Sequence, residues 1–263
     1  MVLIIIGVVL IVLGGVLVFV VRTRIKNKNI EIQFMKTTTI PELTGTLKEN
    51  EAQGLENYRE YAELKGIASS DNPQKTPCSG QDVAYYDAAI YQVFEEVETY
   101  RDDSGTHQRV NRREDLMSSQ KSTGSLVLKD AQTGDKAYIE LLARGMQLDT
   151  VKSLDKFEPV NMMNQYGFFS SFSFGERGSR TLGFRMVEKT IPLDHALYVL
   201  GDAYLQGGRL NITKPADSKK PFIVSVKSEA DLVHGNKVGA TVALVIGIIL
   251  AVGGVALISA GLF

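Results

Sequence analysis

The sequence predicts an α+β protein that is mainly β, with a β-rich, barrel-like soluble domain flanked by two transmembrane helices. All Lys, Arg, Asp and Glu residues lie between Arg22 and Lys237, so both ends of the chain are uncharged. Each uncharged end is long enough to cross a hydrocarbon core of about 30 Å as a helix. The charged middle contains short β-rich segments separated by Gly-containing turns, which is typical of sheets that close into barrels.

The first element, residues 1–21, is predicted to be a retained transmembrane helix. A cleaved signal peptide is the alternative, but a basic segment before the apolar run and a small-residue cleavage site before Arg22 are both missing. The second span, residues 238–262, is apolar all round, which is unlike a helix with one buried face. We expect the chain to end at the far side of the membrane.

Orientation follows from the basic residues beside the spans. Four of them, Arg22, Arg24, Lys26 and Lys28, follow the first span, whereas Lys227 and Lys237 precede the second. The positive-inside rule therefore predicts that the soluble domain is cytoplasmic and that both termini lie on the opposite side.

Glycines in the two spans predict that the helices pair as an antiparallel hairpin. Gly14 and Gly247 lie at similar depths from the charged ends, and Gly7 and Gly253 form a second, deeper level. Small residues at facing positions allow close backbone approach. Two alternatives stay open: glycine is common in membrane helices, and these glycines could instead contact another copy of the chain.

Residues 22–62 are predicted to be a basic juxtamembrane and lead-in segment. Pro41 favours extended backbone at residues 39–40 and a short helix up to Leu47. Residues 56–62 could be helix or strand. The β-rich domain is expected over residues 63–233.

Within that domain the expected elements are defined by β-forming residues and turns. Strands are expected at residues 63–69, 82–101, 185–191 and 222–228, with further hairpins around residues 131–135 and 206–208. Residues 110–125 show no clear period, residues 143–161 form a connector that could be partly helical, and residues 228–234 approach the membrane as a short helix. The strands could form one barrel or two related lobes.

Several of these segments together resemble the GIDE domain. They include ELKGIAS, then PCSG leading to AYYDAAI, and later GFRMVEKTIPLDHALYVLGDA, RLNITKP and PFIVSVKSEADLV. The positions that carry the resemblance are Pro77, Ser79, Gly80, Tyr85, Tyr86, Pro192, Gly201, Pro221 and Ser225. This domain is found in the MULAN/GIDE group of membrane-anchored E3 ubiquitin ligases of mitochondria and chloroplasts, which also have two flanking helices. The resemblance covers most of residues 37–233.

One departure bears on activity. The organellar ligases carry a zinc-binding RING after the second span, whereas this sequence ends at Phe263 and contains only one Cys and three His. Those residues are too few for the zinc ligands of a RING. The resemblance therefore implies a RING-less member of the bacterial type, in a plasma or thylakoid membrane.

The remaining candidates for chemistry favour structural interpretations. His107, His195 and His234 lack metal-ligand spacing, and Cys78 has no neighbouring base in sequence that would make it a nucleophile. The Ser118-x-x-Lys121 spacing is expected about once by chance, and residues 175–183 are favoured as a glycine-rich turn. We expect no catalytic residue, metal site or cofactor.

One aromatic stretch has two interpretations. Phe168 and Phe169, followed by Arg177 and Arg180, could belong to a core strand. They could instead form an apolar loop that contacts lipid or a protein partner, with the arginines on anionic head groups.

The expected function is non-catalytic. A domain anchored at both ends suits a scaffold or accessory subunit of a membrane assembly, with membrane lipid and a protein partner or a second copy as its contacts. The balanced charge of 29 basic and 30 acidic residues argues against nucleic acid. The alternatives are a ubiquitin-ligase-like system whose RING is on another chain, or an unrecognised membrane-bound hydrolase.

Overall fold

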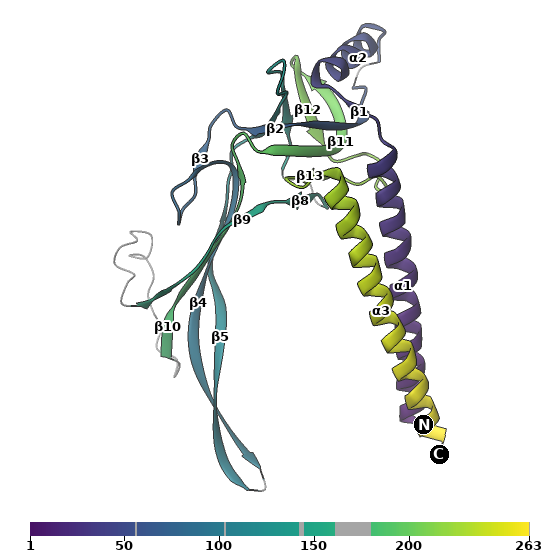
Figure 1. Ribbon diagram of the computed structural model, residues 1–263, viewed down its shortest axis with the longest axis vertical. Helices are drawn as coiled ribbons and strands as arrows, with labels where there is room; N and C mark the ends of the chain where they lie inside the picture. Colours follow the sequence, from purple (N-terminus) through teal and green to yellow (C-terminus); the bar gives the residue numbers. More distant parts are fainter. Residues whose placement is uncertain (56, 103, 142–144, 161–179, 263) are drawn as a thin grey trace.

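Two long helices form one end of the molecule. The computed structural model describes residues 1–55, 57–102, 104–141, 145–160 and 180–262. Helix α1 (Val2–Phe34) and helix α3 (Glu229–Leu262) lie side by side and antiparallel, with the two chain termini together (Figure 1). Both are long and apolar enough to cross a membrane. α1 continues without a break through part of the expected lead-in segment, and the expected approach helix at residues 228–234 is the first part of α3.

The two helices approach each other closely at two glycine levels. A Cβ atom on Gly7 would lie 2.5 Å from the carbonyl oxygen of Gly254, and one on Gly14 would lie 2.8 Å from that of Gly247. Gly254, and not Gly253 as predicted, lies opposite Gly7. A Cβ on Gly253 would meet nothing within 4 Å. Each residue turns the helix by about 100°, so counting located the level but not the face.

The centre of the molecule is a closed barrel. Its strands, in spatial order, are β2 (Glu60–Ser69), β6 (Leu126–Lys129), β7 (Lys136–Ile139), β12 (Arg209–Thr213) and β11 (Ala196–Gln206). The ring closes because β11 also pairs with β2. β7 and β12 pair in parallel, and the other neighbours are antiparallel. This strand order and these directions are those of the OB-fold, a five-stranded Greek-key barrel.

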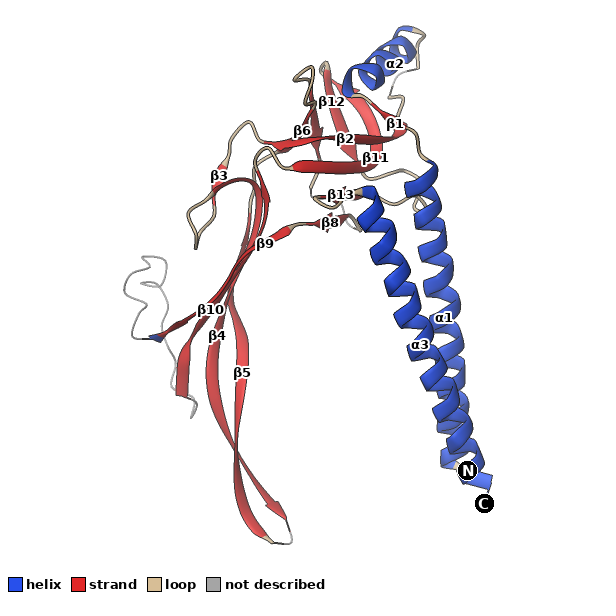
Figure 2. Cartoon of the chain, viewed as in Figure 1, coloured by secondary structure: helices blue, strands red, loops and turns tan. Residues whose placement is uncertain are grey.

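Three short strands extend the barrel sheet. β1 (Thr37–Thr38) pairs in parallel with β2, and β13 (Ile223–Ser225) pairs with β11 in line with β12. β8 (Gln147–Asp149) lies beside β13. β13 and β1 are the segments that connect the barrel to α3 and α1, so the sheet extends to the top of the helix pair (Figure 2).

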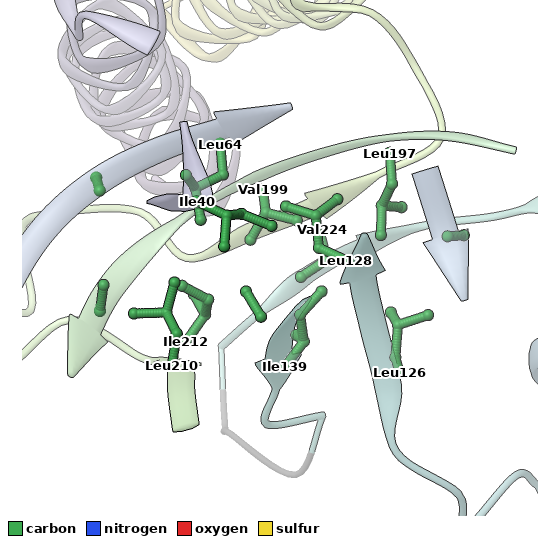
Figure 3. Packing of buried hydrophobic residues seen from close by; sticks show 14 of the residues in the cluster. Ile40, Leu64, Leu126, Leu128, Ile139, Leu197, Val199, Leu210, Ile212 and Val224 are labelled. Carbon is green, nitrogen blue, oxygen red and sulfur yellow. The ribbon is translucent and has the colours of Figure 1, made fainter. Parts of the chain in front are cut away.

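Helix α2 (Ile40–Ala52) covers the end of the barrel that faces away from α1 and α3 (Figure 1). The Thr39 hydroxyl accepts a hydrogen bond from the backbone N–H of Glu42 at 3.3 Å and caps the helix, as expected for a threonine at this position. α2 inserts Ile40, Leu43 and Leu47 into the barrel core. Figure 3 shows that core, in which residues from α2 and the barrel strands interdigitate; the labelled members are Ile40, Leu64, Leu126, Leu128, Ile139, Leu197, Val199, Leu210, Ile212 and Val224.

A second sheet, which we call the arm, projects from the barrel. Its strands run in the order β5 (Gly105–Lys121), β4 (Asp82–Asp102), β10 (Arg180–Pro192) and β9 (Val151–Pro159). β3 (Gln74–Lys75) pairs with the start of β4, on the same side as β5. All these pairings are antiparallel. The arm is built from two insertions into the barrel, one between β2 and β6 and the other between β7 and β11.

The base of the arm is continuous with the barrel core. Ala84 and Tyr85 from β4 and Ile191 from β10 belong to the same buried cluster as the barrel residues. The sequence therefore encodes one barrel with a projecting arm, and not two related lobes.

One expectation for a single segment was wrong. The connector at residues 143–161 contains strands β8 and β9, and its described part contains no α-helix. Residues 110–125, which lack a period, lie mostly in β5. Both faces of β5 are largely exposed, so burial imposes no alternation of apolar and polar residues. The mainly β fold class with two long apolar terminal helices is confirmed.

Candidate functional site

A large cavity lies where the barrel meets the helix pair. It has a volume of about 940 Å³ and is lined by β2, β11, the segment after β13 and the first turns of α3. Its polar lining residues include Lys65, Tyr198, Lys227, Glu229 and His234. The cavity therefore lies at the level where the soluble domain is attached to α3.

A buried carboxylate next to this cavity holds the junction together. Glu63 is 1% exposed and accepts hydrogen bonds from the Thr37 hydroxyl at 2.6 Å and from the Tyr198 hydroxyl at 3.0 Å. The Lys65 ammonium lies 3.0 Å from Glu63 and 3.0 Å from Glu229 of α3. Burial and the neighbouring Glu63 carboxylate raise the pKa of Tyr198, so the phenol stays protonated and remains a donor.

This arrangement suits attachment better than acid–base catalysis. A general base needs an oxygen that can reach a substrate proton, but Glu63 is already bonded to Thr37, Tyr198 and Lys65. These donors come from β1, β11 and β2. Lys65 also forms an ion pair with Glu229, which connects the network to the first turn of α3. The network fixes the barrel relative to the helix that leaves it.

Apolar and polar contacts extend the same junction to α1. Ile32 packs in one buried cluster with residues of β11, β13 and α3. The Asn236 side chain of α3 donates a hydrogen bond to the Asn29 side chain of α1 at 2.7 Å, and Lys28 of α1 bonds to Gln147 of β8. Barrel and helix pair therefore form one packed unit.

The Pro-Cys-Ser-Gly segment encloses a second buried carboxylate. Glu188 of β10 is 0% exposed and accepts hydrogen bonds from the backbone N–H of Cys78 at 2.6 Å and from the Ser79 hydroxyl at 2.5 Å. Gly80 completes the turn with a φ of 69°, a backbone conformation that glycine adopts more readily than other residues. Burial and the adjacent Glu188 raise the pKa of the Cys78 thiol to about 12. Cys78 is therefore a thiol at neutral pH, and not a nucleophile.

The remaining positions of the resemblance occupy packed sites. Tyr85 and Tyr86 are buried in β4, and Pro192 ends β10. A Cβ on Gly201 would lie 2.8 Å from the Thr213 carbonyl oxygen, so β11 and the end of β12 approach closely there.

Two further positions lie near β13. The Pro221 carbonyl accepts a hydrogen bond from the Tyr61 hydroxyl at 2.9 Å. Ser225 is fully buried and its hydroxyl accepts a hydrogen bond from the Lys227 N–H at 3.0 Å. These contacts indicate that the residues of the resemblance stabilise the fold.

The three histidines lie in different segments: at the tip of the arm, in the turn before β11 and in α3. His107 at the tip of the arm contacts Asp102 at 3.1 Å and Ser104 at 3.0 Å, and its ring stacks on Tyr100. The His195 carbonyl accepts a hydrogen bond from the Ala68 N–H at 2.7 Å, and His234 lines the junction cavity. Among the described residues, no group of three or more His, Cys, Asp or Glu side chains is placed to hold a metal ion.

The Ser-x-x-Lys spacing lies on an edge strand of the arm. Ser118 and Lys121 belong to β5, and Lys121 forms an ion pair with Asp87 at 3.0 Å. Arg180 is the first residue of β10 and is exposed. Phe168, Phe169 and Arg177 lie outside the described residues, as does most of the 175–183 segment.

The distal part of the arm is a two-stranded ribbon. The pairing of β10 with β4 ends at Glu95, beyond which β4 pairs with β5 alone in the described chain. The ribbon carries cross-strand polar pairs such as Glu96 with Arg113 at 2.7 Å. It also exposes apolar side chains: Val110 of β5 is 58% exposed, and so is Leu116 nearer the base. An isolated two-stranded ribbon is at best marginally stable in water.

The arm and the helix pair leave the barrel on the same side. Figure 1 shows the arm running roughly along the helices, with its tip beyond the level of the chain termini. In a bilayer crossed by α1 and α3, the ribbon therefore lies beside the hydrocarbon level. Its charges, among them Glu98, Arg101, Arg109 and Arg112, make contact with lipid tails unfavourable. In such a bilayer the arm would need water or other protein around it.

Comparison with known families identifies the chain. A family model for GIDE, described as E3 ubiquitin ligase, matches residues 95–258, more than half of the 263 residues. The chain belongs to the GIDE family. The matched part of this GIDE protein runs from the distal arm through barrel strands β6, β7, β11 and β12 into α3. Searches of curated proteins and of solved structures each found no match.

The positions quoted for the resemblance fall both inside and outside this match. Pro192, Gly201, Pro221 and Ser225 lie within it, whereas the Pro-Cys-Ser-Gly turn and Tyr85 precede it. Sequence reasoning did not single out Glu63 or Glu188, because a carboxylate in a strand is usually exposed. The only local signal is the apolar residues that surround each of them in sequence.

Proposed function

We propose that this GIDE protein is a non-catalytic scaffold or accessory subunit of a membrane assembly, anchored by α1 and α3. The arm carries this proposal. It is a charged sheet beside two apolar helices, its distal ribbon is too thin to be stable alone, and it exposes apolar side chains. An arm of this kind requires protein and water around it, and an assembly supplies both.

The junction supports the same proposal. Lys65, Glu63 and Tyr198 connect the barrel to the first turn of α3, and Asn29 and Asn236 connect the two helices. A partner held by the arm is thereby held at a fixed place relative to the membrane. The basic residues beside the spans support a barrel on the cytoplasmic face of the membrane.

Shortening the arm tests the proposal. Glu95 and Arg112 are directly paired across β4 and β5, so an Asn-Gly turn can replace residues 96–111 and close a shorter hairpin. We expect the intact protein, extracted in mild detergent, to migrate in native electrophoresis as an assembly. The shortened protein should migrate as a single chain with an unchanged barrel, which its thermal unfolding can verify.

Two results would contradict this expectation. A shortened protein that still assembles like the intact one would remove the arm from the proposed interface. An intact protein that is a single chain both in mild detergent and in lipid nanodiscs would refute the scaffold function.

The family description favours one second candidate. In that case the protein would be the membrane subunit of a ubiquitin-ligase-like system whose RING lies on another chain. Mass spectrometry of the purified assembly distinguishes the two, because this candidate requires a stoichiometric partner with a zinc-binding RING. An assembly that lacks such a partner excludes it.

A further inference from the structure

We infer that the junction cavity binds a membrane phospholipid whose head group carries a primary amine, of the phosphatidylethanolamine class. The cavity has a volume of about 940 Å³, which is in the size range of small-molecule sites. Its lining combines apolar side chains with a few charged ones. All of these residues belong to one chain, so the inference goes beyond the proposed assembly and does not depend on it.

The cavity has three walls. The paired strands β2 and β11 form the wall on the barrel side, and Gln33 near the end of α1 forms a second. The third wall is one face of α3, on which Ala230, His234 and Lys237 recur every three or four residues. The lining therefore follows α3 from its first turn toward the bilayer for about 12 Å.

The lower end of the cavity lies at the surface of the bilayer. Lys237 is the last charged residue of α3, and the uncharged span begins at Val238. Below this point the same face of α3 continues with exposed apolar side chains, among them Ile248 and Val252. A polar head-group region separates the hydrocarbon core from water. A phospholipid beside α3 would therefore place its head group in the cavity and its acyl chains against the apolar face.

The charges on α3 are ordered along the cavity. Asp231 lies in the first turn, and His234 and Lys237 lie about one and two turns closer to the bilayer. In an aminophospholipid the phosphate is attached to the glycerol, and the ammonium group is farther from the acyl chains. The phosphate would accept hydrogen bonds from Lys237 and His234, and the ammonium would donate to Asp231. The order of charges in the cavity matches the order in the head group.

These three side chains are accessible to a ligand. In the described part of the chain, the exposed side chains of His234 and Lys237 form neither a hydrogen bond nor an ion pair. Asp231 is also exposed and accepts a hydrogen bond from the Ser228 hydroxyl at 2.6 Å. A carboxylate can accept several hydrogen bonds, so Asp231 retains sites for an ammonium donor.

The other charged residues of the lining already have partners of opposite charge. The Lys65 ammonium lies 3.0 Å from the Glu229 carboxylate, and the Lys227 ammonium lies 3.3 Å from the Asp149 carboxylate. These two pairs add no net charge to the cavity. Recognition of the head group therefore rests on the residues of α3 below its first turn and on Asp231.

Lipid selectivity tests the inference. A primary ammonium donates up to three hydrogen bonds, whereas the trimethylated nitrogen of phosphatidylcholine donates none and phosphatidylglycerol has no cation. We expect phosphatidylethanolamine to bind about tenfold more tightly than either, which is the effect of one hydrogen bond to a charged group. Native mass spectrometry of the intact protein in mild detergent, titrated with each lipid in turn, measures the lipid bound per chain.

Substitutions of exposed residues separate the two ends of the head group. Asp231→Asn should reduce phosphatidylethanolamine binding about tenfold, to the level of phosphatidylcholine, whereas Asp231→Glu should keep the preference. Lys237→Gln should weaken binding of all three lipids. Ala230→Phe fills the cavity without a change of charge and should abolish binding of all three. Lys26→Gln is the matched control, because Lys26 is an exposed lysine of α1 outside the cavity.

Three results would overturn the inference. Equal affinities for the three lipids would refute recognition of the amine. Equal losses in Lys26→Gln and Lys237→Gln, or unchanged binding in Ala230→Phe, would show general attraction to the basic surface and no site in the cavity. Soluble phosphoethanolamine should bind far more weakly than the lipid, because it lacks the acyl chains. If it binds as tightly, the ligand is a soluble amino phosphate and the lipid assignment is wrong.

Discussion

At the scale of single residues, the most informative positions are two buried carboxylates that hold loops and strands in place. Glu188 binds the backbone of the Pro-Cys-Ser-Gly turn, and Glu63 binds residues of three strands at the end of the barrel next to the helix pair. Each is surrounded by donors, which a buried carboxylate needs in order to remain stable. This explains why the turn contains a serine and a glycine next to the cysteine.

The environment of Cys78 predicts low thiol reactivity. Its pKa of about 12 lies well above the usual value of 9.0. At pH 8 the thiolate fraction of the folded protein should be about a thousand-fold smaller than that of the unfolded chain. Alkylation by iodoacetamide should therefore be much slower in buffer than in urea. The variant Glu188→Gln, which removes the neighbouring charge, should alkylate faster than wild type when folded.

The same thiol makes stability depend on pH in one direction. Between about pH 9 and pH 12 the folded protein keeps a proton that the unfolded chain loses. The contribution of Cys78 is therefore complete below about pH 9 and decreases as the pH rises toward 12. Equal alkylation rates in buffer and urea would contradict the burial of this group.

At the scale of elements, the helix pair and the arm show two kinds of packing. The helices contact each other through glycines whose carbonyl oxygens occupy the space that a Cβ would need. Close packing of small residues is the usual way in which membrane helices associate. In the arm, by contrast, Arg185 of β10 bonds Asp155 of β9 at 2.7 Å and Glu114 of β5 at 3.1 Å, joining strands across the sheet. The Arg185 guanidinium holds the pKa of Asp155 below its usual range.

Neighbouring glycines of α3 provide a matched test of the helix contact. A valine at position 254 would place its Cβ 2.5 Å from the Gly7 carbonyl oxygen, whereas one at position 253 meets nothing within 4 Å. Gly254→Val should therefore lower the free energy of unfolding by about 1–3 kcal/mol, the usual cost of overpacking. Gly253→Val should leave it almost unchanged. Thermal unfolding in detergent compares them, and equal losses would contradict the helix contact.

At the scale of the whole molecule, a small barrel carries both an anchor and an arm. The anchor begins at the strands that extend the barrel sheet, and the arm is inserted into two of the barrel connections. Because Ala84, Tyr85 and Ile191 of the arm lie in the barrel core, the arm and the helix pair are attached to one rigid centre. The position of the arm relative to the membrane is therefore set by the barrel.

The side of the membrane on which the barrel lies is open to a direct test. Basic residues flank the barrel end of both helices, and none lies in the apolar segments near the termini. We expect protease added to inside-out vesicles to cleave the barrel, and protease added to right-side-out vesicles to leave the barrel intact. Protection of the barrel in inside-out vesicles would reverse the orientation.

The sequence by itself determined the class of this protein. Uncharged ends of sufficient length identified both long helices, and turns with glycine located hairpins such as the one between β6 and β7. The order and spacing of segments such as LYVLGDA and RLNITKP indicated the family that the family model supports. These signals are local, because length, charge and turn chemistry act within a few residues of one another.

Only the tertiary structure decided which strands pair, which helix faces touch and which residues bond the buried carboxylates. β5 lacks an apolar period because neither of its faces is fully buried, so its strand structure depends on pairing with β4. Which glycine of α3 faces α1 depends on helix rotation, and the donors of Glu63 and Glu188 come from distant segments. The fold therefore turned a predicted barrel between two apolar ends into a closed barrel with a charged arm beside its anchor.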